Sequence, residues 1–543
     1  MNIELTLKEL FEKKNFSEIE SKIEKLGKLE DLSPKIQLYY ATSKALNINS
    51  SEDDFKIAAF LYEKFYKEKK NNLEFFYNLI FTSVKAKFFE YLEDHIISMY
   101  EKNKEDPKIL EGLGKMYFYY NEMEKVTKFY EKLLKIKPEY LNIWSSYIAS
   151  LNYHYIYNQK KYLEISNKID NLPLTKIDNF KKTKPKKKIK IGFLSQDFKT
   201  HSVTFFLKET LEYTNKNDFE LHALSNLKEN EYDKNTSDFK TIFCKWHDLS
   251  NLSDTEFIKY VRSLELDIVI DLSGHTYNNR INCLRSRCAP IQISWLGYCN
   301  SLGIKNMDYL IADPNLIKKN EEKLYQEKIL YMPKIWNVYS RPSDIPKSNN
   351  SENKESFTFG SFNNFQKISS LTIKTWSRII KNGKSILILK NSVSTNEKRA
   401  NEILLSKFSK EGVDTNKIII LDTKKNFKEH LECYNKIDLA LDTFPYPGVT
   451  TSFEAISMGV PVLTMRGFNF NSRCGESINL NLGLSKLIAK DENDYMDKAF
   501  QIQENRNKLN EIKEEIKLNS ENSPIFNSKE FSVNFFKLIK GLI

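Results

Sequence analysis

The sequence is poor in glycine and proline, which together account for 30 of its 543 residues (16 Gly and 14 Pro). That share is about half of the roughly 12% found in average proteins. The scarcity excludes collagen-like chains and Gly/Pro-rich low-complexity segments. It also makes each glycine inside a candidate motif more informative.

Cysteine is scarce as well, and no two of the six cysteines form a Cys-x-x-Cys pair. Their scattered spacing excludes a disulfide framework and a zinc-ligand set, and it predicts a reducing, cytoplasmic location. The start of the chain, MNIELTLKELFEKKNFSEIE, lacks the apolar core of a signal peptide. No apolar run approaches the about 18 residues that a membrane span needs, so we predict no such span.

Acidic residues are in the minority: 83 Lys and Arg face 72 Asp and Glu, a net charge of +11. A basic excess can indicate partners that carry phosphate groups. Here the lysines are spread along the whole chain, and the one dense run, Lys181–Lys190, is more typical of a solvated linker than of a nucleic-acid patch. We therefore predict no nucleic-acid partner.

Residues 1–170 have the periodicity of helices and almost no strand-like alternation. Between Asp106 and Tyr140 the pattern predicts a helix pair that breaks at Asn121-Glu122. The Leu113-Gly114-x-x-Tyr117 kernel and the closing proline are similar to a tetratricopeptide repeat. An unrelated helical bundle is the alternative, since one clear copy does not establish a period. Either way, this region offers a surface rather than chemistry.

After a basic linker and connecting segment at 171–187, short apolar runs alternate with helical segments, which is typical of parallel α/β sheets. The alternation stops at a polar stretch near residues 339–354 and then restarts. We predict two doubly wound, Rossmann-like domains at 188–345 and 355–500, followed by C-terminal helices at 501–543. The runs that predict strands are 188–198, 219–225, 266–276, 290–298 and 307–313 in the first domain, and 357–364, 385–390, 417–422, 437–442 and 461–465 in the second.

The segment Ile437–Met465 predicts a strand, a Pro/Gly turn, a helix and a further strand. Thr450 or Thr451 would cap that helix and leave backbone N–H groups at its positive end. Gly448 would let the backbone approach a phosphate closely, and Glu454 could accept a hydrogen bond from a ribose hydroxyl. An ordinary strand–turn–helix unit is the alternative, because the segment contains neither a P-loop nor a dinucleotide fingerprint.

Three further side chains follow predicted strands, where ligands of such sheets bind. Lys367 could stabilise a leaving diphosphate by its charge, although an ordinary surface lysine is the better interpretation of this residue alone, because the chain is rich in lysine. His201 and His275 could accept or relay a proton, or could be loop residues bonded to backbone. The chain contains no Asp-x-Asp pair to hold a metal–diphosphate complex. Lysine and helix N-termini would therefore have to neutralise the leaving group.

Several motifs in order and spacing resemble the catalytic region of protein O-GlcNAc transferases and their SPINDLY-type relatives. They are SQDFKTHSV, DLSGHTYNNRI, APIQISWLGYCNSLG, MDYLIAD, FGSFNNFQKI, LDTFPYPGVTTSFEAISMGVPVLTM and NSRC. The likeness extends from about Asp106 to the end. It implies a tetratricopeptide-like helical arm and a GT-B fold, a nucleotide-sugar donor held by the second domain, and an acceptor peptide along the repeats.

The resemblance also implies roles for individual residues. Lys367 matches the family lysine on the diphosphate, and Thr450 and Thr451 match the phosphate-binding threonines. His201 matches a histidine near the acceptor, and His275 the histidine of the Gly-His-Thr motif. The remaining residues of the implied nucleotide-sugar site are Asn364, His430 (beside the base), Gly448 and Glu454 (on the ribose).

Three positions depart from the family pattern. Val449 stands where animal enzymes have histidine, Phe427 where they have a lysine near the ribose, and Cys299 where a proline is usual. These departures concern the donor side. UDP-GlcNAc is the preferred donor, and GDP-fucose and UDP-glucose stay open.

We therefore predict an inverting, metal-independent glycosyltransferase without a cofactor, which moves a sugar, most readily GlcNAc, to Ser/Thr hydroxyls of proteins. The alternatives are transfer of fucose or glucose to Ser/Thr or to Asn, and a repeat scaffold with an inactive GT-B half. The sequence makes no prediction about the acceptor protein or the oligomeric state.

Overall fold

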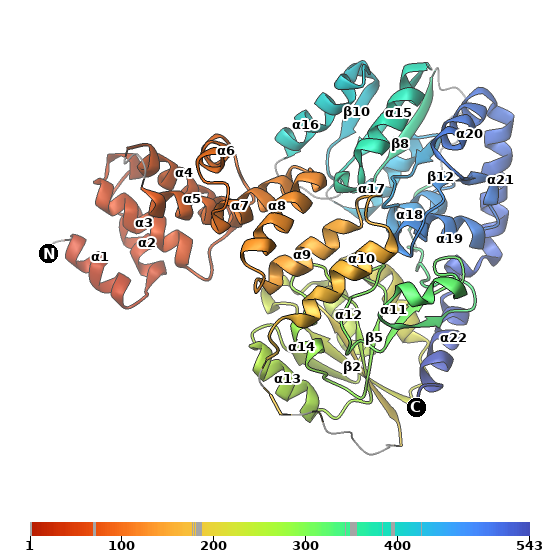
Figure 1. The fold of residues 1–543 in the computed structure, drawn as a ribbon, viewed down its shortest axis with the longest axis horizontal. Helices are drawn as coiled ribbons and strands as arrows, with labels where there is room; N and C mark the ends of the chain where they lie inside the picture. The colour runs from red at the N-terminus through yellow and green to blue at the C-terminus, as the bar shows by residue number, and fades with distance from the viewer. Residues whose placement is uncertain are drawn as a thin grey trace. The chain divides into compact units, whose positions relative to one another are not determined.

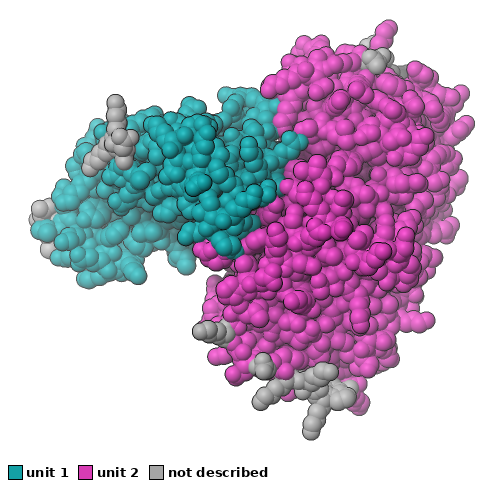
Figure 2. All heavy atoms as spheres, in the orientation of Figure 1, with its two compact units in different colours: residues 1–138, 394–403 teal, residues 139–393, 404–543 magenta. Residues whose placement is uncertain are grey.

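The computed structural model describes residues 3–68, 72–175, 177–178, 180, 187–342, 344–347, 356–382, 384–391, 397–424 and 426–543. Most of the basic run at 181–190 lies outside the described residues. The chain forms two compact units, coloured separately in Figure 2: unit 1 contains residues 1–138 and 394–403, and unit 2 contains residues 139–393 and 404–543. No helix of the described residues is both long enough and apolar enough to cross a membrane.

Unit 1 is built from helices whose sequence neighbours pack against one another, as the helical periodicity predicts. Asp106 caps one of them by accepting from the N–H groups of Lys108 and Ile109, and Pro107 occupies its first position. The helices are α1 (Ile3–Glu12), α2 (Phe16–Glu24), α3 (Pro34–Leu46), α4 (Glu52–Glu68), α5 (Leu73–Lys85), α6 (Glu93–Lys102), α7 (Pro107–Tyr119) and α8 (Met123–Ile136).

The helix pair predicted between residues 106 and 140 is present as α7 and α8. Asn121 lies between them with a φ of 60° and turns the chain. Gly114 of α7 faces Tyr130 of α8 so closely that a Cβ atom on the glycine would lie 2.2 Å from a ring carbon. Because Tyr130 is itself buried, the close contact of the two helices depends on the absence of a side chain at position 114.

Two further helices, α9 (Leu141–Leu151) and α10 (Gln159–Ser166), belong to unit 2. The predicted helical region at 1–170 is therefore divided by the structure. Buried hydrogen bonds explain the division: Gln159 Nε2 donates to Asn300 Oδ1 (2.8 Å), and Asn469 Nδ2 donates to Gln159 Oε1 (3.1 Å). Gln159 thus joins residues from both α/β parts of unit 2.

The first of these parts, here called the first lobe (residues 188–342), contains a parallel seven-stranded sheet in the order β3-β2-β1-β4-β5-β6-β7. Its helices are α11 (Thr204–Glu212), α12 (Lys234–Ile242), α13 (Asp254–Ser263) and α14 (Ile281–Arg285). Its strands are β1 (Ile189–Ser195), β2 (Phe219–Ser225), β3 (Lys245–Asp248), β4 (Ile268–Asp271), β5 (Ile291–Ser294), β6 (Tyr309–Ala312) and β7 (Lys328–Tyr331).

The second lobe (residues 356–500) repeats this plan with a parallel six-stranded sheet in the order β10-β9-β8-β11-β12-β13. Figure 1 labels β8, β10 and β12 of this sheet. Its helices are α15 (Ser370–Asn382), α17 (Phe427–Glu432), α18 (Thr450–Ser457), α19 (Cys474–Asn481) and α20 (Glu492–Glu504). Helix α16 (Glu397–Lys410) begins in the residues assigned to unit 1 and ends in unit 2. Its strands are β8 (Phe357–Ser361), β9 (Ser385–Lys390), β10 (Ile418–Leu421), β11 (Leu439–Leu441), β12 (Val462–Met465) and β13 (Ile488–Ala489).

The two predicted doubly wound domains are confirmed, and all ten predicted runs contain a strand. Their apolar residues lie in one buried core because helices cover parallel sheets on both faces. Sequence analysis missed β3, β7 and β13. Strands β3 and β7 are edge strands that begin with a lysine and contain partly exposed residues, and β13 has only two residues. None of the three therefore forms a distinct apolar run.

The C-terminal helices do not all stay with the second lobe. Helix α20 packs on β12 and α21 (Arg506–Asn522) packs on α20, whereas α22 (Ser528–Lys540) packs on α11 of the first lobe. Ser532 Oγ of α22 donates to the carbonyl of Thr210 (2.7 Å), and Phe535 packs on Trp295 with ring centroids 4.4 Å apart. The last helix therefore completes the core of the first lobe.

Replacing Gly114 with alanine is expected to destabilise unit 1. Alanine gains about 1 kcal/mol of helix propensity over glycine, but overpacking a buried contact costs about 1–3 kcal/mol, and the Tyr130 ring cannot move away. We expect a lower thermal unfolding midpoint by circular dichroism. Lys128→Ala, at an exposed position of α8, is the control; equal or higher stability of Gly114→Ala would contradict the close packing.

Candidate functional site

The strand order reverses next to the first strand of each sheet, between β1 and β4 and between β8 and β11. In doubly wound sheets ligands bind at these reversal points, beyond the carboxyl ends of the strands. All the sequence-predicted residues except His430, which lies in α17 after β10, follow those four strands. His201 and His275 come after β1 and β4; Asn364 and Lys367 come after β8; Gly448, Thr450, Thr451 and Glu454 come after β11.

The carboxylate of Asp442, directly after β11, organises the loop that precedes α18. It is 2% exposed. Its Oδ1 accepts from the N–H of Gly448 (2.7 Å) and from Asn363 Nδ2 (3.0 Å), and its Oδ2 accepts from Thr464 Oγ1 (2.7 Å). Burial raises the pKa of Asp442, and these hydrogen bonds oppose the rise.

Asn363, at the end of β8, connects this loop to α18. Its Nδ2 also donates to Thr443 Oγ1 (3.1 Å), and its Oδ1 accepts a hydrogen bond from the Thr451 hydroxyl. A Cβ atom on Gly448 would lie 2.6 Å from Asn363 Oδ1 and 2.5 Å from Thr451 Oγ1. Only glycine therefore fits at position 448, because the loop backbone passes directly over these side chains.

The helix α18 begins at Thr450, with Val449 at the N-cap position and no side-chain cap hydrogen bond. The prediction that Thr450 or Thr451 caps the helix is therefore wrong: Thr450 and Thr451 are its first two residues, and Thr451 Oγ1 is turned to Asn363 instead. The first turn also contains no acidic residue. This helix start thus keeps its positive dipole end and its first N–H groups available for an anion.

Lys367 lies in a short helical turn (Phe365–Lys367) after β8, and its ammonium points to the same loop. Nζ donates to the carbonyl of Pro447 (2.9 Å) and lies 4.2 Å from the centroid of the Tyr446 ring. Burial lowers the pKa of the Lys367 ammonium, and the carboxylate of Asp442 opposes the fall. The charge therefore lies beside the loop that leads to the uncapped start of α18. Asn364, three residues after β8, caps the turn by accepting from the N–H of Gln366 (3.1 Å).

Glu454, one turn into α18, and His430, in α17, form a second polar cluster. His430 Nε2 lies 2.9 Å from Glu454 Oε2, and the Tyr434 hydroxyl lies 3.0 Å from the same oxygen. Among the described residues, Glu454 Oε1 accepts no hydrogen bond. One oxygen of this buried carboxylate is thus held in place, and the other can accept from a ligand hydroxyl.

His201 lies in the loop between β1 and α11, with a side chain that is 43% exposed. Its Nδ1 accepts from the N–H of Val203 (3.3 Å) and lies 3.8 Å from Asp197 Oδ2. In the neutral ring the proton then resides on Nε2. In this arrangement His201 presents an N–H donor rather than a proton acceptor to a ligand. No hydrogen bond of the described residues joins it to the second lobe.

His275 is buried, with 3% of its surface exposed. Its Nδ1 lies 3.1 Å from Ser145 Oγ and its Nε2 lies 3.0 Å from the carbonyl of Leu302, so both ring nitrogens are occupied. Burial lowers the pKa of His275 to about 4. The predicted catalytic role is not favoured by this geometry: the ring is neutral and holds α9 and the 302 carbonyl together.

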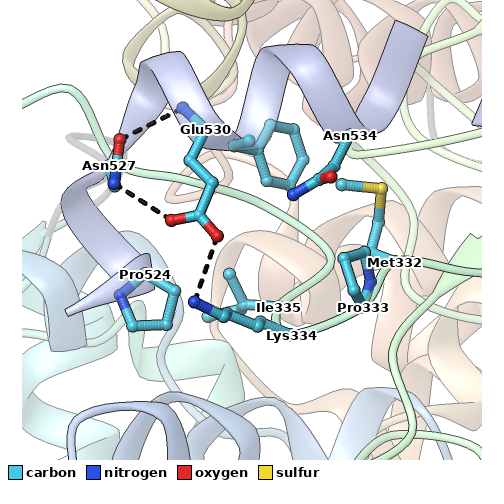
Figure 3. A pocket seen from close by; sticks show the side chains of 9 residues that line it. Met332, Pro333, Lys334, Ile335, Pro524, Asn527, Glu530 and Asn534 are labelled. Carbon is cyan, nitrogen blue, oxygen red and sulfur yellow. Dashed lines mark hydrogen bonds and ion pairs between the residues drawn. The ribbon is translucent and has the colours of Figure 1, made fainter. Parts of the chain in front are cut away.

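A hollow away from these strand ends has no such chemistry. Met332, Pro333 and Ile335 line one side of it, and residues at and before the start of α22 line the other (Figure 3). Lys334 and Glu530 form an ion pair across it (3.1 Å), and Asn527 Nδ2 donates to Glu530 Oε2 (3.1 Å). Its charged groups are paired with each other, and none of the sequence-predicted residues lines it.

The described residues contain no group of three or more His, Cys, Asp or Glu side chains that could hold a metal ion. Positive charge at the site comes from lysine side chains and from the start of α18.

Sequence analysis missed three residues of the site: Asn363, Asp442 and Lys390. Asp442 could have been found as an acidic residue directly after a buried strand, and Asn363 as the neighbour of Asn364. Lys390 ends β9 and is 4% exposed. In a chain with so many lysines, no local signal distinguishes it.

The sequence pattern of glycosyl transferase family 41 matches residues 148–346 and 346–535 of the chain. Two plant proteins, each described as a probable UDP-N-acetylglucosamine–peptide N-acetylglucosaminyltransferase SPINDLY, are similar to it. The one from Solanum lycopersicum is 28% identical over 66% of this chain and 39% of its own length. The one from Oryza sativa subsp. japonica is 27% identical over 74% of this chain and 44% of its own length. The chain thus spans about two fifths of these relatives.

Among solved structures, a mutant of the Thermobaculum terrenum O-GlcNAc transferase has a similar fold, with a TM-score of 0.80 and 22% sequence identity. The match covers 94% of this chain and 97% of that one. It confirms the predicted order of a helical region followed by two Rossmann-like domains.

The pKa of His275 makes the stability of the fold depend on pH. The folded-state pKa of about 4 is below the ordinary value of about 6.5, so the unfolded chain binds more protons between these values. The stabilisation is complete above pH 6.5 and is lost as the pH falls towards 4.

Urea unfolding at pH 7.5 and pH 5 tests this. Between these pH values the free energy of unfolding of the wild type should fall by about 2 kcal/mol more than that of His275→Gln. The buried carboxyl groups are shared by both proteins and cancel in the difference. Equal losses in the two proteins would show that His275 is not held neutral by the fold.

Proposed function

The chain belongs to glycosyl transferase family 41, and from that premise we propose that it transfers a sugar from a nucleotide-sugar donor to Ser/Thr hydroxyls of protein acceptors. UDP-N-acetylglucosamine is the preferred donor, in line with the names of the plant relatives. The observation that supports the proposal most is the meeting of the Lys367 ammonium with the loop before the uncapped start of α18. This is the charge arrangement that a leaving diphosphate needs.

In the proposed complex the diphosphate lies over Gly448, where no side chain obstructs it. The N–H groups of Thr450 and Thr451 and the Thr450 hydroxyl bind its oxygens, and Asn364 borders it from the β8 side. The free Oε1 of Glu454 accepts from a ribose hydroxyl, and the His430 ring lies beside the base. The carboxylate of Asp442 does not touch the donor; it holds the loop in this conformation.

The acceptor oxygen attacks C1 of the sugar from the face opposite the diphosphate, so that the configuration at C1 is inverted and the hydroxyl proton passes to water. As the bond from C1 to the phosphate oxygen breaks, negative charge grows on the diphosphate. Lys367 and the start of α18 stabilise that charge without reorganising, an effect worth about 3–4 kcal/mol per well-placed donor. No divalent metal is required, because this chain's own groups supply the positive charge.

His201 is proposed to act on the acceptor. With Nδ1 occupied by the Val203 N–H, its exposed Nε2–H donates to the acceptor and orients it. The acceptor peptide itself is proposed to bind along the helical repeats, as the family resemblance implies.

The test is a panel of UDP- and GDP-sugars, first by thermal shift and then in transfer assays with Ser/Thr peptides. A ligand at a hundred times its Kd should raise the free energy of unfolding by about 2.7 kcal/mol. We expect UDP-N-acetylglucosamine to give the largest shift, and transfer to continue with excess EDTA. Mass spectrometry of the product distinguishes Ser/Thr from Asn linkage.

If GDP-fucose or UDP-glucose gave the largest shift, the proposed donor would be wrong. Loss of transfer with EDTA would contradict metal independence. No binding of any nucleotide sugar would leave the scaffold alternative.

Lys367→Met should lower kcat about 10²–10³-fold, because one preorganised charge on the leaving group is lost. Binding of UDP should weaken much less, since the nucleoside contacts remain. Lys374→Met, at an exposed position of α15 in the same lobe, is the matched control and should leave both quantities unchanged. Wild-type kcat in Lys367→Met would refute the proposed role.

A further inference from the structure

Lys390 is a buried cation beside the proposed nucleoside end of the site. It is the last residue of β9 and is 4% exposed. Its neighbour Leu389 pairs with Ser361, the last residue of β8, so the Lys390 side chain starts at the same sheet edge as Asn363 and Asn364. Its Nζ lies 2.9 Å from Nδ1 of His430.

This contact determines which nitrogen of His430 carries the proton. An ammonium group can only donate, so Nδ1 of His430 must accept. The ring proton is then on Nε2, which donates to Glu454 Oε2 (2.9 Å). The hydrogen bonds therefore run in one direction, from Lys390 through His430 to Glu454, and connect β9 with α18.

Aromatic side chains hold the same ring from its other sides. The His430 centroid lies 5.8 Å from those of Phe427 and Tyr434 and 6.4 Å from that of Phe362. Phe427 in turn stacks on Phe205 of the first lobe (4.9 Å). The cation that contacts His430 comes from β9.

We propose that Lys390 is a positioning residue for the nucleoside part of the donor: it fixes the tautomer and orientation of His430, and through His430 it aligns Glu454 with the ribose. This proposal rests on the proposed function. Lys390 then affects recognition of the nucleoside only. The departure of the diphosphate is assisted by Lys367.

Isothermal titration calorimetry on the full chain can separate these effects with UDP, GDP and inorganic pyrophosphate. Lys390→Met should weaken the preferred nucleoside diphosphate about tenfold, whereas pyrophosphate, which lacks a nucleoside, should bind within twofold of wild type. In transfer assays KM for the donor should rise with little change in kcat. Lys384→Met, at the exposed residue directly before β9, is the control and should behave as wild type.

A double-variant comparison tests whether Lys390 acts through His430. The double variant Lys390→Met/His430→Phe should bind the nucleoside diphosphate as tightly as the single variant with the lower affinity, because each substitution removes the same hydrogen bond between Lys390 and His430. Losses that multiply would overturn the proposal. If the methionine variant does not fold, Lys390→Gln replaces it, with several-fold weaker binding of the nucleoside diphosphate and unchanged pyrophosphate expected.

Two results would overturn the proposal while leaving the proposed function intact. One is unchanged binding of the nucleoside diphosphate by Lys390→Met; the other is an equal loss for the nucleoside diphosphate and pyrophosphate, which would indicate general damage to the lobe. If wild type binds none of the three ligands, the proposed function fails first and this inference fails with it.

Discussion

The candidate site depends on the buried carboxylate of Asp442. A carboxylate in the interior is stable only when its oxygens are well hydrogen-bonded, and here a loop N–H, a threonine hydroxyl and an asparagine amide meet that need. Because those donors come from β8, β12 and the loop before α18, satisfying one carboxylate brings three segments into register. The two features that the proposed diphosphate site depends on, an uncapped helix start and a glycine with no room for a side chain, follow from that arrangement.

The charges of the second lobe are divided along its sheet edge. Lys367 lies beside the loop at the start of α18, and Lys390 lies one strand further along, next to His430 and Glu454. A diphosphate needs diffuse positive charge, whereas a nucleoside needs oriented donors and acceptors. The separation of the two lysines therefore suits the two ends of the proposed nucleotide-sugar donor. Val449 at the cap position of α18 contributes to this division, because it leaves the first-turn N–H groups uncovered.

The two histidines of the first lobe show how burial divides similar residues between different roles. His201 and His275 both follow strands at the reversal point of the first sheet, and both belong to motifs of the family resemblance. His201 is partly exposed with a free Nε2–H, whereas His275 is enclosed with both nitrogens bonded. The first can meet an acceptor, and the second connects α9 to the lobe. The two histidines thus occupy similar positions after a strand but differ in their exposure to solvent.

Local patterns were enough to predict the alternation of helices and strands apart from β3, β7 and β13, the tandem of two doubly wound sheets and the strand ends at which most site residues occur. These features depend on local periodicity and on residue types next to one another. The folded chain was needed to show that helices α9 and α10 belong with the α/β lobes, that α22 returns to the first lobe, that Val449 and not a threonine precedes α18, and that His275 is buried. It also revealed the contacts of Asn363 and Asp442, whose positions after strands were visible in the sequence, and of Lys390, for which there was no local signal. These features depend on contacts between residues far apart in the chain, such as Asn363 with Asp442 and Lys390 with His430. Burial and hydrogen-bond partners arise only when such residues pack together, so no local pattern contains them.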